Sequence, residues 1–217
     1  MTFKRRGGLA DEVVTYVRTQ ILSGSMRPGQ KIDQDAIGEA LGLSRSPIRE
    51  GLVVLGQEGL VDITPRRGAF VAKITREDVL DHYALFGLVS GRVAAIAATA
   101  LSVEDREQLR SVHERFVHAP AEDYAKFNDE FHQVINSAAP RRTRWLLRQL
   151  ERSIPAGFFE FTPGWYERAI ADHLAILNAV IAGDADAARS TMEHHLNHAG
   201  ITAAEALSRR GFWEEHK

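Results

Sequence analysis

The sequence predicts a mainly α-helical protein, with an N-terminal winged helix-turn-helix and a C-terminal antiparallel bundle of about six helices. Three observations carry this prediction. Two short helical segments meet at Gly42-Leu43-Ser44, a pair of short strands follows them, and the remaining chain has helical periodicity with repeated helix-start signals. We expect the boundary between the two modules after residue 74, which gives domains of residues 1–74 and 75–217.

Composition is that of a folded protein, with 44% hydrophobic and 26% charged residues among 217. The absence of cysteine excludes disulfides, thiolate metal sites and cysteine nucleophiles. The sequence shows no apolar run of membrane-spanning length and no secretion signal, so we expect a cytoplasmic protein with no membrane partner. Charge and histidine divide the chain. Residues 1–75 carry 11 basic against 8 acidic side chains, whereas residues 76–217 carry 16 against 21 and all nine histidines.

The first module begins with an amphipathic helix over 8–23, which ends before the Pro28-Gly29 turn. Asp33 is placed to cap a short helix that ends at Leu41, and Gly42 follows as a helix-ending glycine. Ser44 then caps a third helix that runs to about residue 58. The stretch LVDITPRRGAFVAKI predicts strands over 60–64 and 69–73, joined by a turn at 65–68.

The third helix has arginine at its start and apolar residues behind it. Arg45 and Arg49 are one helical turn apart, and the apolar side that would hold the helix consists of Ile48, Leu52, Val53 and Leu55. In a helix-turn-helix, the start of the second helix enters the major groove, where arginine matches guanine or phosphate. An arginine pair taken alone favours the simpler interpretation of solvated surface charges on an ordinary helix. The turn, the caps and the basic hairpin together favour a DNA-binding surface of Ser44, Arg45, Ser46, Arg49, Arg66, Arg67 and Gly68.

The same residues resemble a known family. LSGSMRPGQKI, GEALGLSRSPIREGL, EGLV and PRRGAFV follow, in continuous register, the DNA-binding domain of the GntR family of bacterial transcription regulators. The resemblance implies a winged helix-turn-helix that binds double-stranded DNA, with Gly68 at the tip of the wing. Gly38 and Gly51 stand where that family usually has alanine, and each glycine costs about 1 kcal/mol in helix propensity.

The second module reads as helices over about 76–100, 103–118, 121–138, 141–153, 163–182 and 185–209. Asn128 and His132 share one face of the third of these helices, and His173 and His195 lie near the middle of the last two. Facing side chains in an antiparallel bundle can converge on a divalent metal. The other histidines have the simpler interpretation of structural or solvated residues: His82, His113, His118, His194, His198 and His216. An aromatic segment, 158–168, is either core packing or a lid, and packing is slightly favoured.

The C-terminal stretch DHLAILNAVIAGDADAARSTMEHHL resembles the ligand-binding domain of FadR-type GntR regulators, in the six-helix, VanR-like branch. This resemblance implies a metal set of Asn128, His132, His173 and His195, with zinc expected ahead of nickel or manganese. Asn128 replaces the family's usual aspartate, so we expect weaker metal binding, and the sequence leaves the occupancy of the site open. The family's effector-binding arginine is missing from its usual helix. Its role is either lost here or taken by Arg92 or Arg148.

The predicted function is a homodimeric transcription regulator, more commonly a repressor in this family, that binds a pseudo-palindromic operator and responds to a small organic acid. A metalloregulator that senses the metal itself is an alternative. A metal-dependent hydrolase with an accessory DNA-binding domain is less favoured, because the sequence has no nucleophile motif, phosphate-binding glycine loop or well-placed general base.

Overall fold

The computed structural model describes residues 8–153 and 164–213. It divides the chain into two compact units. Among the described residues, the first comprises 8–75 together with 207–213, and the second comprises 76–153 and 164–206. The main division is therefore one residue from the expected boundary, and residues 207–213 cluster with the first unit.

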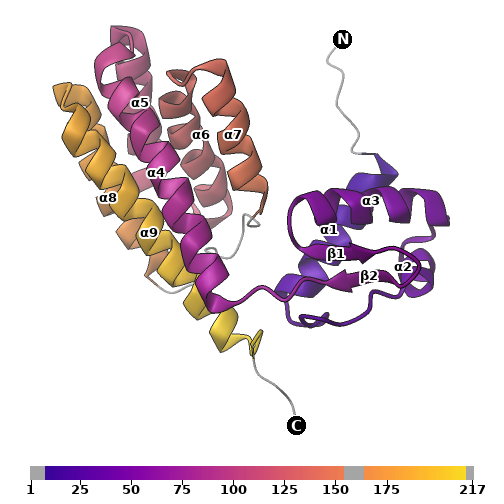
Figure 1. The fold of residues 1–217 in the computed structure, drawn as a ribbon. Coiled ribbons are helices and arrows are strands. Elements are labelled where there is room, and N and C mark those ends of the chain that lie inside the picture. Colours follow the sequence, from indigo (N-terminus) through magenta and orange to yellow (C-terminus); the bar gives the residue numbers. More distant parts are fainter. Residues whose placement is uncertain (1–7, 154–163, 214–217) are drawn as a thin grey trace. The chain divides into compact units, whose positions relative to one another are not determined.

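The first unit contains helices α1 (Leu9–Leu22), α2 (Gln34–Leu41) and α3 (Arg45–Gln57), followed by strands β1 (Val61–Thr64) and β2 (Gly68–Val71) (Figure 1). The strands pair antiparallel, with Val61 opposite Val71 and Thr64 opposite Gly68. An isolated bridge between Lys31 and Phe70 adds the segment before α2 to the other edge of β2. This order is the winged helix-turn-helix that the sequence predicts.

Burial in the first unit follows the apolar spacing of its helices. The buried side chains of α1, α2 and α3 include Val13, Val17, Ile21, Ile37, Ile48, Leu52 and Leu55. The assignment of Val53 to this inner face is wrong, because its side chain is 48% exposed. Val53 lies only one position, or about 100°, from Leu52 on the helix, which turns it out of the contact with α1.

Gly51 is explained by the packing of α3 on α1. A Cβ atom built on Gly51 would lie 2.8 Å from Cβ of Val13 and 3.0 Å from the carbonyl oxygen of Ala10. The two helix backbones approach too closely for the alanine that is usual here. The cost of glycine in helix propensity is therefore offset by a closer contact between the helices.

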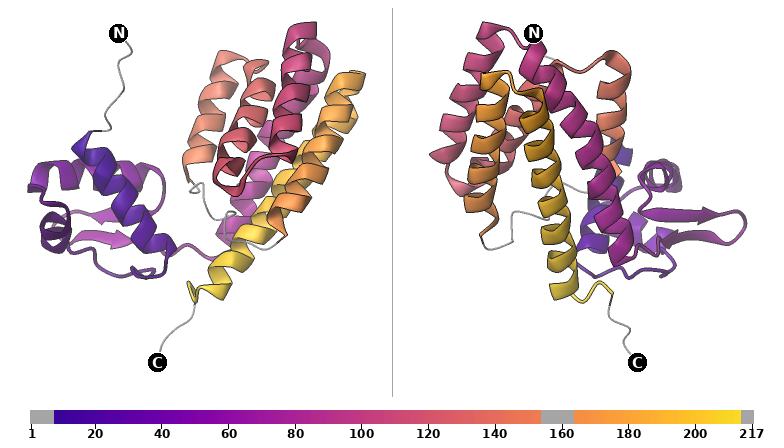
Figure 2. Two further views of the ribbon diagram at one scale, coloured as in Figure 1. Left: turned by 180° about the vertical axis from the view of Figure 1, so that it is seen from behind. Right: turned by 60° about the vertical axis from the view of Figure 1, so that its left-hand side comes forward.

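The second unit is all helical in its described residues. Its helices are α4 (Arg76–Ala100), α5 (Val103–Val117), α6 (Tyr124–Ser137), α7 (Arg141–Ser153), α8 (Trp165–Ala182) and α9 (Ala185–Arg209). Figure 2 shows them running roughly parallel and antiparallel to one another as a bundle. A single 3₁₀ turn, Ala121–Asp123, replaces the expected start of α6. The six helices among the described residues lie at the expected places and confirm the sequence prediction for this unit.

Helix α4 is central to the bundle. It packs on α6, α7 and α8, while α5 packs on α6 and α8. Of the described helices, α4 alone is long and apolar enough to cross a membrane by length and composition. A buried core helix passes the same test, and α4 supplies core residues such as Val93, Ala94 and Ala97. This packing accounts for its apolar composition.

The aromatic segment is only partly described, since residues 158–163 lie outside the described residues. Of the remainder, Tyr166 donates its hydroxyl to the carbonyl oxygens of Phe116, at 2.6 Å, and Val117, at 3.0 Å. Its ring stacks on Tyr124 with centroids 3.6 Å apart. This residue ties α8 to the end of α5, which favours packing over a lid for its part of the segment.

Candidate DNA-binding surface and metal centre

The turn between α2 and α3 is fixed by local hydrogen bonds. The Asp33 carboxylate accepts from the backbone amides of Asp35 and Ala36, which caps α2. Gly42 ends α2 with φ of +66°, a left-handed conformation that suits glycine. Ser44 occupies the first cap position of α3, but its side chain makes no capping hydrogen bond. Its hydroxyl therefore remains available for another acceptor or donor.

The start of α3 is anchored from one side and exposed on the other. Ile48, Leu52 and Leu55 are at most 2% exposed. Ser44, Arg45, Ser46 and Arg49 are all exposed. The helix thus presents both arginines outward from a buried apolar face, as the sequence predicts.

Arg45 has a partner that the sequence reasoning did not identify. Its Nε lies 3.2 Å from Oδ1 of Asp35, and its Nη2 lies 3.0 Å from Oδ1 and 3.2 Å from Oδ2. The two side chains are 71% and 69% exposed. The pair joins the first turn of α2 to the first turn of α3 across the helix-turn-helix.

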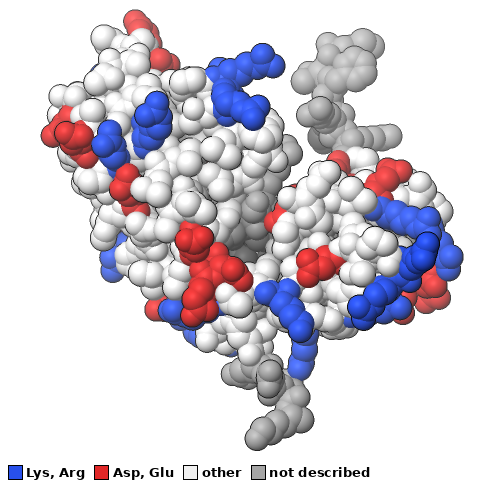
Figure 3. All heavy atoms as spheres, viewed as in Figure 1, with Lys and Arg blue, Asp and Glu red and all other residues white. Residues whose placement is uncertain are grey.

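The turn between β1 and β2 is tight and basic. Arg66 has φ of +62° and Gly68 has φ of +109°, and the Arg67 amide donates to the carbonyl oxygen of Thr64 at 3.1 Å. The Arg66 and Arg67 side chains are exposed, whereas Gly68 is half-buried. Figure 3 shows Lys and Arg side chains gathered on the side of the first unit that carries α2 and this turn. The wing therefore adds positive charge near the recognition helix.

Three of the four predicted metal ligands come together in the bundle. The ring nitrogens that His132, His173 and His195 can offer all lie within 4.8 Å of one another. Their ring centroids are 4.9–5.3 Å apart. They come from three different helices, α6, α8 and α9, so the three rings meet only in the folded bundle.

His173 is the most buried of these histidines, with 0% exposure. Neither of its ring nitrogens has a hydrogen-bond partner among the described residues. Its ring stacks on Phe131, with centroids 4.2 Å apart and planes 7° from parallel. Burial and the neighbouring His195, His132 and His113 hold the pKa of His173 well below its usual value. The imidazole is therefore neutral, which is the form that binds metals.

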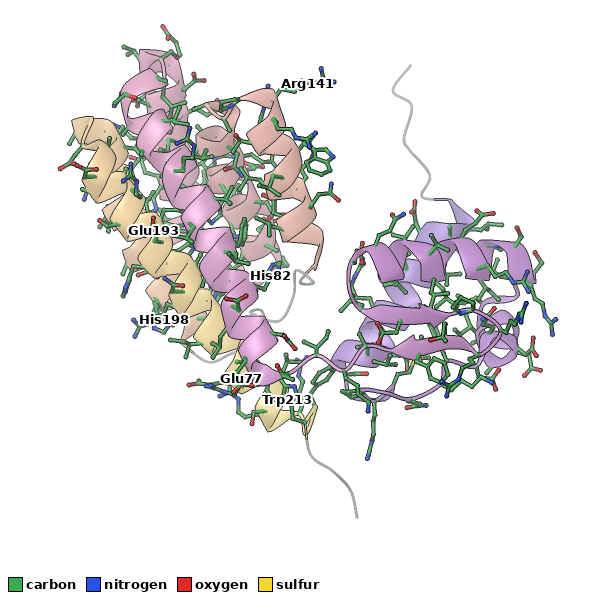
Figure 4. The ribbon with its side chains drawn as sticks, in the orientation of Figure 1. Glu77, His82, Arg141, Glu193, His198 and Trp213 are labelled. Carbon is green, nitrogen blue, oxygen red and sulfur yellow. The ribbon has the colours of Figure 1, made fainter. Side chains whose placement is uncertain are left out.

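His132 and His195 complete the triad in different environments. Burial and the neighbouring His195 lower the pKa of His132 to about 3. Nδ1 of His195 lies 3.2 Å from Oδ2 of Asp172. Burial would raise the pKa of Asp172, but the hydrogen bond and charge of His195, with charges on His194 and His198, bring it below its usual value. Figure 4 labels His198 on α9, three residues beyond His195.

Asn128 lies one helical turn before His132 on α6 and is half-buried. Burial raises the pKa of the adjacent Asp129 carboxyl, and a hydrogen bond from the Asn128 side chain partly offsets this. The Asn128 amide thus has a neighbour of its own, and its service as a metal ligand stays a prediction. Arg92 on α4 and Arg148 on α7 are exposed, whereas His173 and His195 are buried. Their roles in effector binding also stay predictions.

Two residues near the triad were missed or interpreted differently from the sequence. His113 was assigned a structural or solvated role, yet it is only 6% exposed and its Nδ1 has no hydrogen-bond partner among the described residues. It packs beside Phe131 at 6.2 Å between centroids. Asp172 was not identified, although it directly precedes a predicted ligand, His173. That adjacency is a signal that sequence reasoning could have used.

Comparison with known proteins agrees with both units. Residues 9–71 match the model of the bacterial regulatory proteins of the gntR family, and residues 81–198 match the FCD domain. An uncharacterized HTH-type transcriptional regulator of Mycobacterium tuberculosis is 30% identical over 151 residues, which are 69% of this chain and 62% of that protein's length. The HTH-type transcriptional repressor RspR of Escherichia coli is 24% identical over 93% of this chain and 92% of its own.

Solved structures show the same fold. E. coli McbR/YncC superposes with a TM-score of 0.65 at 18% identity, covering 92% of this chain and 98% of its own. A transcriptional regulator from Rhodococcus sp. RHA1 superposes with a TM-score of 0.58 at 23% identity, covering 89% and 96%.

Proposed function

Because the chain belongs to the GntR family of bacterial regulators and carries an FCD domain, we propose that it is a cytoplasmic, homodimeric repressor controlled by an organic acid. The relatives are DNA-binding transcription regulators, which sets the hydrolase alternative aside. The single observation that carries the proposed sensing role is the cluster of half-buried His132 with buried His173 and His195 in the FCD domain.

The proposed DNA contacts are those of α3 and the wing. Exposed Arg45 and Arg49 stand one turn apart on a helix whose opposite side is buried, the arrangement by which a recognition helix enters the major groove. Ser44 and Ser46 would donate to phosphates beside the groove. Arg66 and Arg67 would contact the flanking backbone or minor groove. A single recognition helix reads few base pairs, so two copies on a pseudo-palindrome are required for specificity.

Substitution of the arginines tests this assignment. Arg45→Ala or Arg49→Ala should cost roughly 1–3 kcal/mol of specific binding where the arginine reads a base. An arginine that contacts only phosphate would instead weaken binding to all duplexes alike and flatten the salt dependence. Fluorescence titrations of operator and unrelated duplex at two salt concentrations separate these results. A double variant that binds its operator normally would refute the recognition helix.

The residues present fit a divalent metal. Three imidazoles offer ring nitrogens that lie within 4.8 Å of one another, and the fully buried His173 has two ring nitrogens without a partner among the described residues. A buried polar atom left without a partner costs about 1–3 kcal/mol, so a metal bond there would relieve a real penalty. Nitrogen ligands suit zinc and nickel, and the neutral oxygen of Asn128 would add no charge to the site.

Residues of this chain would hold and orient the metal. Asp172 would fix the ring of His195 by accepting from Nδ1, which leaves Nε2 for the metal. Stacking on Phe131 would fix the plane of His173. A bound divalent metal would supply open positions for the carboxylate of an organic acid. The acid could change operator affinity only by preferring one of two arrangements of the dimer.

The metalloregulator is the second candidate, and one observation favours it. Both arginines expected to meet an acidic effector, Arg92 and Arg148, are exposed. Elemental analysis of protein as purified, followed by chelation, separates the two functions. If chelation abolishes binding of an organic acid such as citrate, the effector model holds. If chelation alone releases DNA and no acid binds, the metal is itself the signal. Full DNA control without either ligand would refute both.

A further inference from the structure

We propose that Asp35 is a positioning residue for DNA recognition: its carboxylate holds the Arg45 guanidinium so that the free edge of that group reads guanine. The proposal deepens the DNA-binding function and rests on the assignment of α3 as the recognition helix. It begins from an acidic side chain on the surface that should face a polyanion. Asp35 is 69% exposed and lies in the first turn of α2, beside the start of α3.

The atoms of the pair determine which edge of the guanidinium is occupied. Asp35 accepts from Nε and Nη2 of Arg45, at 3.0–3.2 Å. These two nitrogens form the side edge of the planar group. The terminal edge of the group consists of Nη1 and the second hydrogen of Nη2. Nη1 donates a hydrogen bond to no described residue. Two parallel donors on that edge match O6 and N7 of guanine.

A carboxylate in this position affects the two classes of DNA contact in opposite ways. It repels phosphates, so it weakens sequence-independent binding to any duplex. It also fixes a side chain that otherwise has many rotamers, so less freedom is lost when the bidentate contact with guanine forms. The net result is higher discrimination rather than higher affinity.

Exposure explains why the pair acts on recognition and not on folding. A salt bridge between two side chains that are each about 70% exposed contributes little to stability in water, because solvent screens it. Water is excluded when the duplex covers this surface, and the same pair then becomes stronger. Asp35 can therefore be changed without loss of the fold, since the cap of α2 comes from Asp33.

The test uses the full-length protein and a randomised duplex library, because selection yields the preferred site directly. The selected duplex, versions with each guanine replaced in turn, and an unrelated duplex are then titrated with wild type, Asp35→Asn and Arg45→Ala. Glu39→Gln is the matched control. It removes the same charge from the exposed side of the same helix, and among the described residues no hydrogen bond or ion pair links Glu39 to either recognition arginine.

In Asp35→Asn, the preference for guanine at one position of each half-site should fall about tenfold. The variant should bind unrelated duplex at least as tightly as wild type. Glu39→Gln should keep the preference. In an Arg45→Ala background, Asp35→Asn should cause no further loss at that position. Retention of the guanine preference in Asp35→Asn, an equal loss in Glu39→Gln, or an additional loss without Arg45 would each overturn the proposal. If Arg45→Ala itself keeps the preference, the assignment of the recognition residue fails instead.

Discussion

Replacing His173 with phenylalanine should change stability in opposite directions with and without metal. The His173 ring is fully buried, stacks on Phe131, and carries two nitrogens without a partner among the described residues. Phenylalanine keeps an aromatic ring in the stack and removes both polar atoms. It also removes one predicted metal ligand, so the same substitution tests the metal centre.

The magnitude follows from two opposing effects. Each unpaired buried polar atom costs about 1–3 kcal/mol, so their removal should stabilise the metal-free protein by about 4 kcal/mol. The larger ring strains a packed core by about 1–3 kcal/mol. We therefore expect metal-free His173→Phe to be more stable than metal-free wild type by about 2 kcal/mol. For a chain of this length that corresponds to a rise in Tm of about 4–8 °C.

Zinc should reverse this order. A ligand present at about 1,000 times its Kd stabilises the folded state by about 4 kcal/mol, so zinc-bound wild type should melt above His173→Phe. Thermal denaturation of chelated and zinc-loaded protein, followed by circular dichroism, measures both differences. His113→Phe is the matched control, since it removes another buried unpaired nitrogen outside the triad and should keep the zinc response.

Two results would refute this reasoning. If metal-free His173→Phe melts below metal-free wild type, the ring nitrogens of His173 are satisfied in the apoprotein. If zinc stabilises His173→Phe as much as wild type, His173 is not a ligand and the proposed centre is wrong.

Three further predictions follow from packing, hydrogen bonding and protonation. Gly51→Ala should destabilise the first unit by about 1–3 kcal/mol, despite better helix propensity, because the alanine Cβ would lie 2.8 Å from Cβ of Val13. Chemical denaturation measures this change, and unchanged stability would mean that α1 can shift away from α3 without cost. Asp172→Asn should weaken zinc binding about 10–100-fold, because the His195 ring loses the carboxylate that orients it. Competition with a chromogenic chelator measures the zinc affinity. Equal affinity in the variant and wild type would show that the hydrogen bond between Asp172 and His195 does not support metal binding. Metal-free protein should lose stability as pH falls below about 6.5, because His132 takes up a proton in the unfolded chain but stays neutral in the folded protein, where its pKa is about 3. The free energy of unfolding should fall by about 1.4 kcal/mol per pH unit. Thermal melts measure this, and a Tm that does not change between pH 7 and pH 5 would contradict it.

Local signals were enough to predict the helix-turn-helix. Asp33 and Gly42 act through hydrogen bonds and dihedral angles within a few residues, so their roles could be assigned without knowledge of the fold. The same holds for the wing, whose turn depends on Arg66 and Gly68. Val53 was misassigned because apolar character alone does not say which of two adjacent helical positions meets the neighbouring helix.

Partners between elements could not be derived in the same way. Asp35 and Arg45 are ten residues apart on two helices, and their contact depends on the angle that the turn imposes. Gly51 appeared unfavourable in the sequence because its benefit lies in the distance to α1. His113 appeared to be one of six unremarkable histidines until burial distinguished it.

The sequence by itself determined the two modules, the helices of each, and the chemical identity of the arginines and histidines that carry the predicted functions. Those features depend on periodicity and on short-range backbone chemistry, which neighbouring residues specify. Only the tertiary structure decided that His132, His173 and His195 lie together in one cluster, that Asp172 accepts from His195, and that Asp35 occupies one edge of Arg45. Such contacts depend on how whole helices pack, and packing is set jointly by residues distant along the chain.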